Sequence, residues 1–256
     1  MPKYKRGIII PDSHVPLHDE AAMNCVLKAI EITKPNVAIF LGDIGEWDSV
    51  SSWKYKRRKR PPVEYIIKDI EKDAEVVNNF LDKFDESFNK INLTNKHVLM
   101  GNHEIWLNNF VEEHPYLTKY LPENVMRLKE RKYKWLPYGK FMSIGKLHFY
   151  HGGHHAGIYH ARHHVVNLGV NVMYGHNHDV SRESIARLDG VHAGFCIGCI
   201  KECCSDSNKW LRGKSMNWGH SFAIIDWSKD GTFRADIVDI TNGQTNLWGV
   251  LIDGRK

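Results

Sequence analysis

Five short motifs in this sequence carry side chains of the kind that bind metal ions. They read DSH from Asp12, GD at Gly42, GNHE from Gly101, HGG from His151 and GHNH from Gly175. Their carboxylate, amide and imidazole groups form a mixture that suits borderline divalent ions such as Mn²⁺, Fe²⁺ and Zn²⁺. The donor residues are Asp12, His14, Asp43, Asn102, His151, His176 and His178.

Seven donors are too many for one catalytic ion, but they suit two ions that share a carboxylate. Two ions about 3.5–4 Å apart can clamp the attacking and leaving oxygens of a phosphoryl group. The motifs therefore predict a two-metal site suited to phosphoryl chemistry.

Each motif follows a segment that we expect to be a β-strand. Residues 6–11 and 36–43 are apolar runs, and the pattern between them predicts a helix from residue 19 to about residue 34. This strand–helix–strand order is typical of a parallel βαβ unit. In open α/β sheets, sites form outside the carboxyl ends of the strands. We therefore expect the five motifs to meet at one edge of a sheet.

Helical spacing of apolar residues from Val63 to Phe88 predicts a long helix, and Pro61-Pro62 suits its start. Residues 96–101 read as a short strand, and residues 104–121 as a weakly patterned helix that forms part of a cap. Later elements are expected as strands on both sides of Ile144-Gly145, a helix over residues 158–168, a strand at 171–176, and a hairpin joined by Asp230-Gly231.

Composition places the chain among globular proteins. Of its 256 residues, 42% are hydrophobic and 25% are charged, and the formal net charge is +5. The apolar run at residues 7–10 is too short for a signal peptide, and no run is long enough to span a bilayer. An odd count of five cysteines argues against a disulfide framework. We therefore expect a cytosolic protein with no membrane partner.

The order of the five motifs resembles that of the calcineurin-like metallophosphoesterases. Their pattern runs Asp-x-His, Gly-Asp, Gly-Asn-His-Asp/Glu, a histidine after a strand, and Gly-His-x-His. The match extends from Asp12 to His178, and the remainder is most similar to phage-encoded members, which would act in the host cytoplasm. The resemblance implies an α/β fold, a four-layer α-β-β-α sandwich of two mixed β-sheets flanked by helices. It also implies one domain over residues 1–256, with a helical insertion or cap around residues 50–135.

The resemblance also implies roles for the motif residues. The first metal would be held by Asp12, His14 and His178, the second by Asn102, His151 and His176, with Asp43 bridging them. His103, and with it Asn102, would contact the phosphoryl group, and His103 would help the leaving oxygen depart. The implied cofactors are two divalent ions, with Mn²⁺ expected first and Fe, Zn or Ni as alternatives. A hydroxide that bridges the metals would attack the phosphate ester, so no covalent intermediate is required.

The stretch around Asp43 departs from the Ser/Thr protein phosphatases of this superfamily, which carry Gly-Asp-x-x-Asp-Arg-Gly. Here Glu46 stands in the place of the second aspartate, and Trp47 in the place of the phosphate-binding arginine. We expect Glu46 to take part in catalysis as the acidic partner that orients His103, with Asp48 as the alternative. The missing arginine disfavours a phosphoprotein phosphatase. Arg182 and Arg212 are candidates for the lost anion contact.

Residues 54–60, KYKRRKR, hold six basic side chains in seven positions. They form either a solvated loop or a surface that contacts a phosphate backbone. The neighbouring aromatic residues Trp47, Trp53 and Tyr55 could stack on bases. We therefore expect a phosphodiesterase that acts on nucleotides or nucleic acid. The alternatives are a phosphomonoesterase or protein phosphatase, and a non-catalytic binding member of the fold.

Residues 148–164 are rich in histidine, but a run of neighbouring residues cannot face one point. His151 is the expected metal ligand of this segment. His154 and His155 follow a Gly-Gly turn and are expected to reach the phosphoryl group. The spacing of the remaining histidines places them on one helix face, where substrate contact and packing are both open; they are His160, His163 and His164.

Two other features carry open interpretations. His220 opens a predicted strand and is expected to contact substrate, although such a histidine can also be purely structural. The cysteines at positions 196, 199, 203 and 204 are crowded into nine residues, whereas a structural zinc site usually has two separated ligand pairs. Reduced thiols are therefore expected there, with a structural metal as the alternative.

Overall fold

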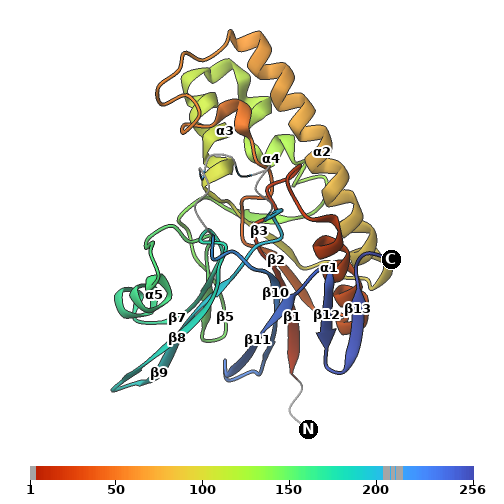
Figure 1. Ribbon diagram of the computed structural model, residues 1–256, viewed down its shortest axis with the longest axis vertical. Helices are drawn as coiled ribbons and strands as arrows, with labels where there is room; N and C mark the ends of the chain where they lie inside the picture. The colour runs from red at the N-terminus through yellow and green to blue at the C-terminus, as the bar shows by residue number, and fades with distance from the viewer. Residues whose placement is uncertain (1–3, 204–207, 209–210, 212–215) are drawn as a thin grey trace.

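The structure is a computed structural model that describes residues 4–203, 208, 211 and 216–256 (Figure 1). Two of the residues singled out above, Cys204 and Arg212, lie outside this described part. Two mixed β-sheets pack face to face between helices, as the resemblance implied. This arrangement of layers is the four-layer α-β-β-α sandwich expected from the sequence.

The first sheet has six strands and contains the expected βαβ unit. β1 is parallel to β2, with Gly7 opposite Val37, and antiparallel to β10, with Gly7 opposite Ile225. In spatial order its strands are β11 (Phe233–Ile240), β10 (His220–Trp227), β1 (Lys5–Ile10), β2 (Val37–Phe40), β3 (Lys96–Leu99) and β4 (Lys134–Leu136).

The second sheet has five strands, and a separate two-stranded hairpin packs against the first helix. β6 and β7 are parallel, whereas β8 and β9 form a long antiparallel hairpin. In spatial order the strands are β5 (Met142–Ile144), β6 (Leu147–Phe149), β7 (Asn171–Tyr174), β9 (Gly190–Ile197) and β8 (Val180–Arg187). The separate hairpin consists of β12 (Gln244–Leu247) and β13 (Val250–Asp253).

Helices cover the outer face of each sheet. α1 (Glu20–Thr33) and α2 (Val63–Lys90) pack on the first sheet, and α5 (His160–Leu168) packs on the second. Asp19 caps α1 by accepting a hydrogen bond from the N–H of Ala22. None of the described helices has both the length and the apolar character needed to cross a bilayer.

β1 is apolar at every inner position because both of its faces are covered. Ile8 and Ile10 face the helices, whereas Ile9 faces the second sheet, and all three are fully buried. A strand that is covered on both faces reads as a continuous apolar run instead of an alternating one. The core between the sheets and the core beneath the helices therefore meet on this strand.

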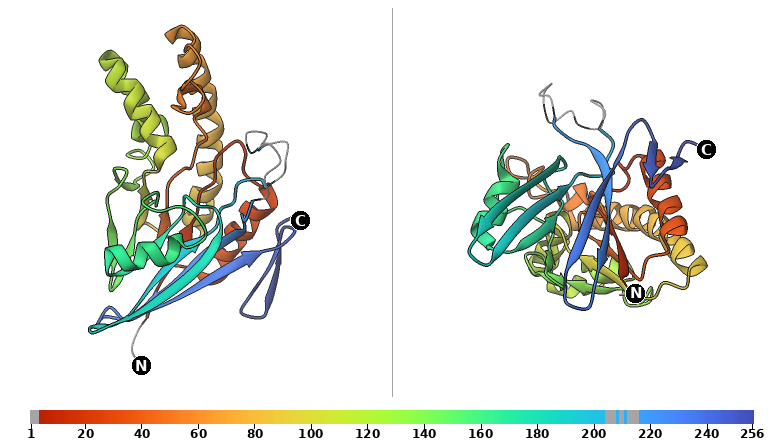
Figure 2. Two further views of the ribbon diagram at one scale, coloured as in Figure 1. Left: turned by 60° about the vertical axis from the view of Figure 1, so that its left-hand side comes forward. Right: turned by 90° about the horizontal axis from the view of Figure 1, so that it is seen from below.

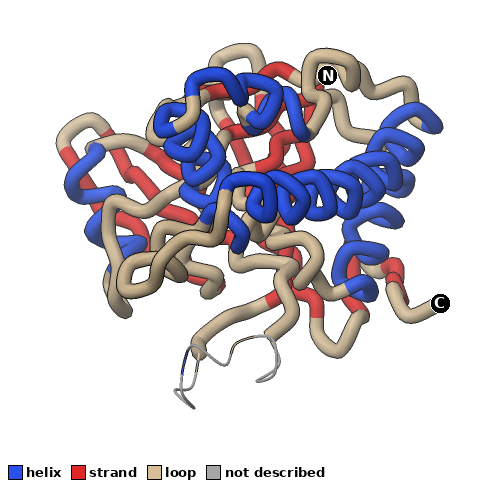
Figure 3. The backbone as a smooth tube through the Cα atoms, turned by 90° about the horizontal axis from the view of Figure 1, so that it is seen from above, coloured by secondary structure: helices blue, strands red, loops and turns tan. Residues whose placement is uncertain are grey.

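The segment around residues 50–135 extends beyond the carboxyl ends of the strands. It contains the short 3₁₀ turns η1 (Asp48–Val50) and η2 (Pro115–Tyr120) and the helices α2, α3 (Asn102–Glu113) and α4 (Pro122–Val125). Figure 2 (left) shows α2 and α3 projecting past the sheets, and Figure 3 shows the helices and tan loops over this end. β3 and β4 also fall within this segment and belong to the first sheet. The expected division into one domain with a helical cap remains a prediction.

Two elements differ from the expected pattern. The weak helix expected over residues 104–121 is α3 followed by η2, because Pro115 follows the end of α3. The β8–β9 hairpin was not predicted as such. β8 is mostly exposed, and its polar sequence VSRESIAR carries little strand signal.

Candidate metal centre

The seven predicted donors converge where the strands end. Asp12 follows β1, Asp43 follows β2, and Asn102 is the first residue of α3, just after β3. His151 follows β6, and the last two donors, His176 and His178, follow β7. The crevice at the carboxyl ends of the strands thus collects side chains from both sheets.

Three of the donors form one buried group. Nε2 of His178 lies 3.2 Å from Oδ2 of Asp12 and 3.0 Å from Nε2 of His14. All three residues are buried. Nδ1 of His14 donates a hydrogen bond to Oε2 of Glu46 at 2.7 Å, which directs its Nε2 toward the group.

The second group is formed by the other three non-bridging donors. Oδ1 of Asn102 lies 2.7 Å from Nδ1 of His176 and 3.0 Å from Nε2 of His151. Nδ1 of His151 donates to the backbone carbonyl of Leu41 at 2.8 Å, so its Nε2 also points into the group.

Asp43 lies between the two groups. Its Oδ2 is 3.7 Å from Nε2 of His14 and 3.4 Å from Nε2 of His151. Its Oδ1 accepts a hydrogen bond from the backbone N–H of His103 at 2.8 Å. One carboxylate oxygen is thus oriented by the backbone, while the other faces donors of both groups.

The backbone at the centre adopts an uncommon conformation. His14, Asp43, His176 and His178 all have positive φ angles, of 50°, 45°, 64° and 65°. Non-glycine residues rarely adopt this region, and such strain concentrates at functional sites. The left-handed turns bring successive side chains of one loop back toward the same point.

Two motif positions require glycine because a carboxylate oxygen lies close to the backbone there. A Cβ atom on Gly101 would lie 2.2 Å from Oδ1 of Asp43, and one on Gly175 would lie 2.0 Å from Oδ1 of Asp12. Any side chain at either position would displace a predicted metal ligand. The glycines of the GNHE and GHNH motifs therefore make room for the carboxylates.

Glu104, the last residue of GNHE, holds the Asp43 loop in place. It is fully buried, and its Oε2 accepts hydrogen bonds from the N–H groups of Asp43 and Gly101, both at 2.8 Å. Its Oε1 accepts from the N–H of Ile44 at 2.9 Å. No local pattern indicates this role for Glu104, because its partners in the Asp43 loop lie about 60 residues away in the chain.

His103 lies beside the Asp43 carboxylate but is not oriented as expected. Its Nδ1 donates to the backbone carbonyl of Glu46 at 2.6 Å, and its Nε2 lies 3.9 Å from Oδ2 of Asp43. The Glu46 carboxylate instead binds His14 and Nζ of Lys201, at 2.7 and 3.0 Å. The expected carboxylate partner of His103 is thus replaced by a carbonyl. Asp48, the alternative, forms an ion pair with Lys54.

The electrostatics of the centre fit bound cations. Oδ1 of Asp12 is buried with no hydrogen-bond partner among the described residues. Burial alone would lower the pKa of His151, but Asp43 and Asp12 outweigh it and raise that pKa to about 10. Burial lowers the pKa of His14 and of His176 to about 4, so both rings are neutral and able to bind a metal. The donor set therefore combines two neutral imidazoles with two carboxylates whose negative charge favours a cation beside them.

A cavity of about 920 Å³ opens over the centre. Three tryptophans line it, namely Trp53, Trp106 and Trp218, and Trp106 packs on the His103 ring with centroids 4.0 Å apart. Its described cations are Lys54 and Lys201, and no sequence signal marked Lys201. Trp47, expected near a base, is fully buried in the core instead.

Several expected substrate contacts lie elsewhere. Arg182 packs on the Phe195 ring in a separate surface hollow of about 700 Å³. His154 packs beside the Tyr150 ring, and His155 hydrogen bonds to Asn167 of α5 at 2.9 Å. None of these three candidates is among the described residues that line the cavity over the centre.

His220 and the cysteines form a neighbouring cluster. Nε2 of His220 lies 2.7 Å from the carbonyl of Lys201 and 3.3 Å from Sγ of Cys203. His220 is likewise absent from the described cavity lining, so its contact with substrate stays a prediction. Cys196 and Cys199 are buried free thiols, and burial raises the pKa of both.

Comparison with known proteins identifies one family. The model of the calcineurin-like phosphoesterases matches residues 6–193. Among solved structures, a single mutant of Vps29 from Entamoeba histolytica is 13% identical, with a TM-score of 0.40 over 92% of this chain and 99% of its own. Chaetomium thermophilum Vps29 is 11% identical, with a TM-score of 0.45 over 94% of each chain.

The phosphoesterase YfcE from E. coli is 13% identical, with a TM-score of 0.39 over 90% of this chain and 98% of its own. At such TM-scores these structural likenesses carry no argument about function. No curated protein matches the chain. The assignment to a family therefore rests on the match of the family model.

Proposed function

This chain belongs to the calcineurin-like phosphoesterase family, and from that premise we propose that it is a two-metal phosphodiesterase of nucleotides or nucleic acid. Family membership supports a metal-dependent phosphoester hydrolase. The observation that carries the proposal further is the arrangement of donors in two groups around Asp43.

In this proposal, each group of donors holds one divalent ion. The first set is Asp12, His14 and His178, the second is Asn102, His151 and His176, and Asp43 bridges the two. Mn²⁺ is the first candidate, because the donors mix carboxylate, amide and imidazole groups, and Fe, Zn and Ni suit the same mixture. When bound, two such ions would stabilise charge on the phosphoryl oxygens and lower the pKa of the attacking water.

The chain's own residues supply orientation and a proton. The Glu46 carbonyl accepts the hydrogen bond from Nδ1 of His103, which leaves Nε2 facing Asp43 and the cavity. From there a protonated Nε2 can donate to the leaving oxygen, as a general acid. Glu46 orients His14 through its carboxylate and His103 through its backbone carbonyl. One residue therefore positions both a metal ligand and the general acid.

The charges on the cavity wall favour a diester over a monoester. Among the described residues, its two cations are each already paired with a carboxylate: Lys54 with Asp48, and Lys201 with Glu46. A monoester dianion would need further positive charge, whereas a diester carries a single negative charge. The three tryptophans of the wall offer flat apolar surface to a nucleobase.

Hydrolysis of bis(p-nitrophenyl) phosphate with added Mn²⁺ tests the proposal. We expect turnover by the unmodified protein, and its loss in Asn102→Ala and His151→Ala, together with loss of bound metal. His163→Ala is the matched control, because His163 is exposed on α5 and outside both donor groups. Full activity in the two ligand variants would overturn the proposed centre.

The ester preference is tested with p-nitrophenyl phosphate under the same conditions. A higher kcat/KM for the diester is expected. A strong preference for the monoester would replace the proposal with a phosphomonoesterase. No bound metal and no turnover with any of the candidate ions would favour a binding protein that keeps the fold.

A further inference from the structure

We propose that residues 53–60, termed here the basic loop, hold a single strand of nucleic acid and lead it toward the metal centre. This inference rests on the proposed function, since the strand is the substrate of that centre. The loop comes shortly after η1, which follows Asp43 closely, and Pro61 and Pro62 separate it from the start of α2. Trp53 and Lys54 belong both to the loop and to the wall of the cavity over the centre.

Ion pairs hold both ends of the basic loop. Lys54 pairs with Asp48 of η1, and Arg60 pairs with Glu113 at the end of α3. The loop is therefore tied at one end beside the cavity and at the other to the projecting helix α3. These two ion pairs fix the ends of the loop and leave its middle residues exposed to solvent.

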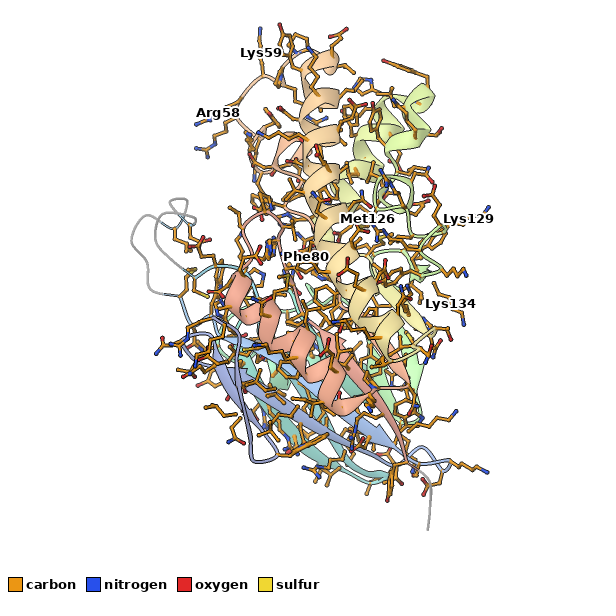
Figure 4. All side chains as sticks on the ribbon, turned by 90° about the vertical axis from the view of Figure 1, so that its right-hand side faces the viewer. Arg58, Lys59, Phe80, Met126, Lys129 and Lys134 are labelled. Carbon is orange, nitrogen blue, oxygen red and sulfur yellow. The ribbon has the colours of Figure 1, made fainter. Side chains whose placement is uncertain are left out.

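The middle of the loop presents unpaired positive charge. Lys56, Arg57, Arg58 and Lys59 are all exposed, and none forms an ion pair within the described part of the chain. Figure 4 shows Arg58 and Lys59 extending away from α2. Four adjacent free cations beside a phosphoester site suit a chain of phosphates, which releases counterions when it binds.

Trp53 distinguishes a single strand from a duplex. This residue is 71% exposed although it lines the cavity, and Nζ of Lys56 lies 5.3 Å from its ring centroid. An exposed indole next to cations is the arrangement that stacks on an unpaired base while the cations contact phosphates. Bases of a duplex are stacked on each other and do not offer their faces.

The test compares binding of two loop variants with that of a charge-matched control. The probe is a labelled oligodeoxythymidine of about 12 nucleotides with phosphorothioate linkages, bound to the metal-loaded protein and followed by fluorescence anisotropy. The charge variant replaces Lys56, Arg57, Arg58 and Lys59 with Gln. The control replaces Arg127, Lys129, Lys132 and Lys134 with Gln; these are also exposed, and Figure 4 shows Lys129 and Lys134 on the other side of α2.

The charge variant is expected to raise Kd by about tenfold or more at moderate salt and to reduce the slope of log Kd against log salt by about 3. Trp53→Ala is expected to raise Kd roughly 5- to 150-fold with no change of that slope. The control should leave Kd unchanged. A duplex of the same length should bind more weakly than the single strand.

The inference is overturned if the charge variant behaves like the control. It is also overturned if the duplex binds as tightly as the single strand and Trp53→Ala has no effect, because any polyanion would then suffice. Hydrolysis of bis(p-nitrophenyl) phosphate by the unmodified protein tests the proposed function separately. Binding with the expected pattern in a protein that hydrolyses no ester would support the strand site and contradict the enzyme.

Discussion

Histidines gather in two regions of this molecule, and among the described residues only the metal centre brings several of them around one shared carboxylate. At the metal centre, the imidazoles come from the loops after β1, β6 and β7 and lie close to Asp12 and Asp43. Around α5, the imidazoles instead pack on each other and on the rings of Tyr150 and Tyr174. The α5 histidines are His154, His155, His160, His163 and His164.

The buried members around α5 already have partners. His160 lies 2.6 Å from the hydroxyl of Tyr174 and 2.8 Å from Oδ2 of Asp179, and Nδ1 of His164 donates to the carbonyl of His160. Local density of histidine therefore marks a packed hydrogen-bonded cluster here. What distinguishes a reactive site is convergence on shared carboxylates at strand ends.

The largest expected contrast is in catalysis at His103. His103→Ala should lower kcat for bis(p-nitrophenyl) phosphate by about 10²–10⁴-fold, the range for loss of a general acid. The bound metal should stay, because His103 is not one of the predicted ligands. Metal analysis and steady-state kinetics check both parts. Equal losses in His103→Ala and in the α5 variant His163→Ala would break the comparison.

A smaller loss is expected when the support of the Asp43 loop is weakened. Glu104→Gln should lower kcat/KM by about 10–100-fold, as for other residues that position metal ligands. The amide can no longer accept from every N–H that Glu104 now satisfies, so the free energy of unfolding should fall by about 2 kcal/mol. Chemical denaturation and kinetics measure the two effects. Glu112→Gln, on the exposed side of α3, should change neither.

The α5 cluster should respond in stability and not in catalysis. His160→Ala removes the link between Tyr174 and Asp179 and should lower the free energy of unfolding by about 2 kcal/mol. Because Asp179 follows His178 directly, the bound metal is the sensitive readout. If His160→Ala releases metal, α5 belongs to the centre and the two regions are not separate.

The smallest effect is expected in the pH dependence of stability at His164. Burial lowers its pKa to about 4 from the ordinary value of 6.5. Below pH 6.5, His164 therefore binds a proton in the unfolded chain but not in the folded chain. The free energy of unfolding falls as a result until the pH reaches about 4. His164→Phe should remove about 1 kcal/mol of this loss, after allowance for screening.

Denaturation of the wild-type and His164→Phe proteins at neutral pH and near pH 4 measures that difference. The exposed neighbour His163, changed to Gln, serves as the control. An unchanged gap between wild type and His164→Phe at the two pH values would mean that His164 titrates freely.

Much of the fold was predictable from local signals. The inner strands β1, β2 and β7 read as apolar runs that end at motif residues, and the long helix α2 shows clear helical spacing. That the seven donors meet follows from the same positions at strand ends, whereas their division into two metal sets was implied by the family resemblance. The β8–β9 hairpin was not predicted, because one face of β8 is exposed and its residues are mostly polar.

The contacts around His103 were not predictable in the same way. Whether Glu46 reaches His103 by its carbonyl or its carboxylate depends on the path of the backbone after Asp43, which turns at a φ of 45°. Glu104 can hold the Asp43 loop only after folding has brought the N–H groups of that distant loop to its carboxylate. Such partners are set by tertiary structure, and no local pattern encodes them.

The place of β1 in the first sheet has a consequence for how the protein is synthesised. β1 lies between β2 and β10, so its second edge is paired only by residues that emerge from the ribosome about 200 positions later. Until then the apolar strand that carries Asp12 presents an open edge, which is a template for pairing with other chains. This chain is therefore more prone to aggregate during translation, before β10 has been synthesised, than after folding is complete.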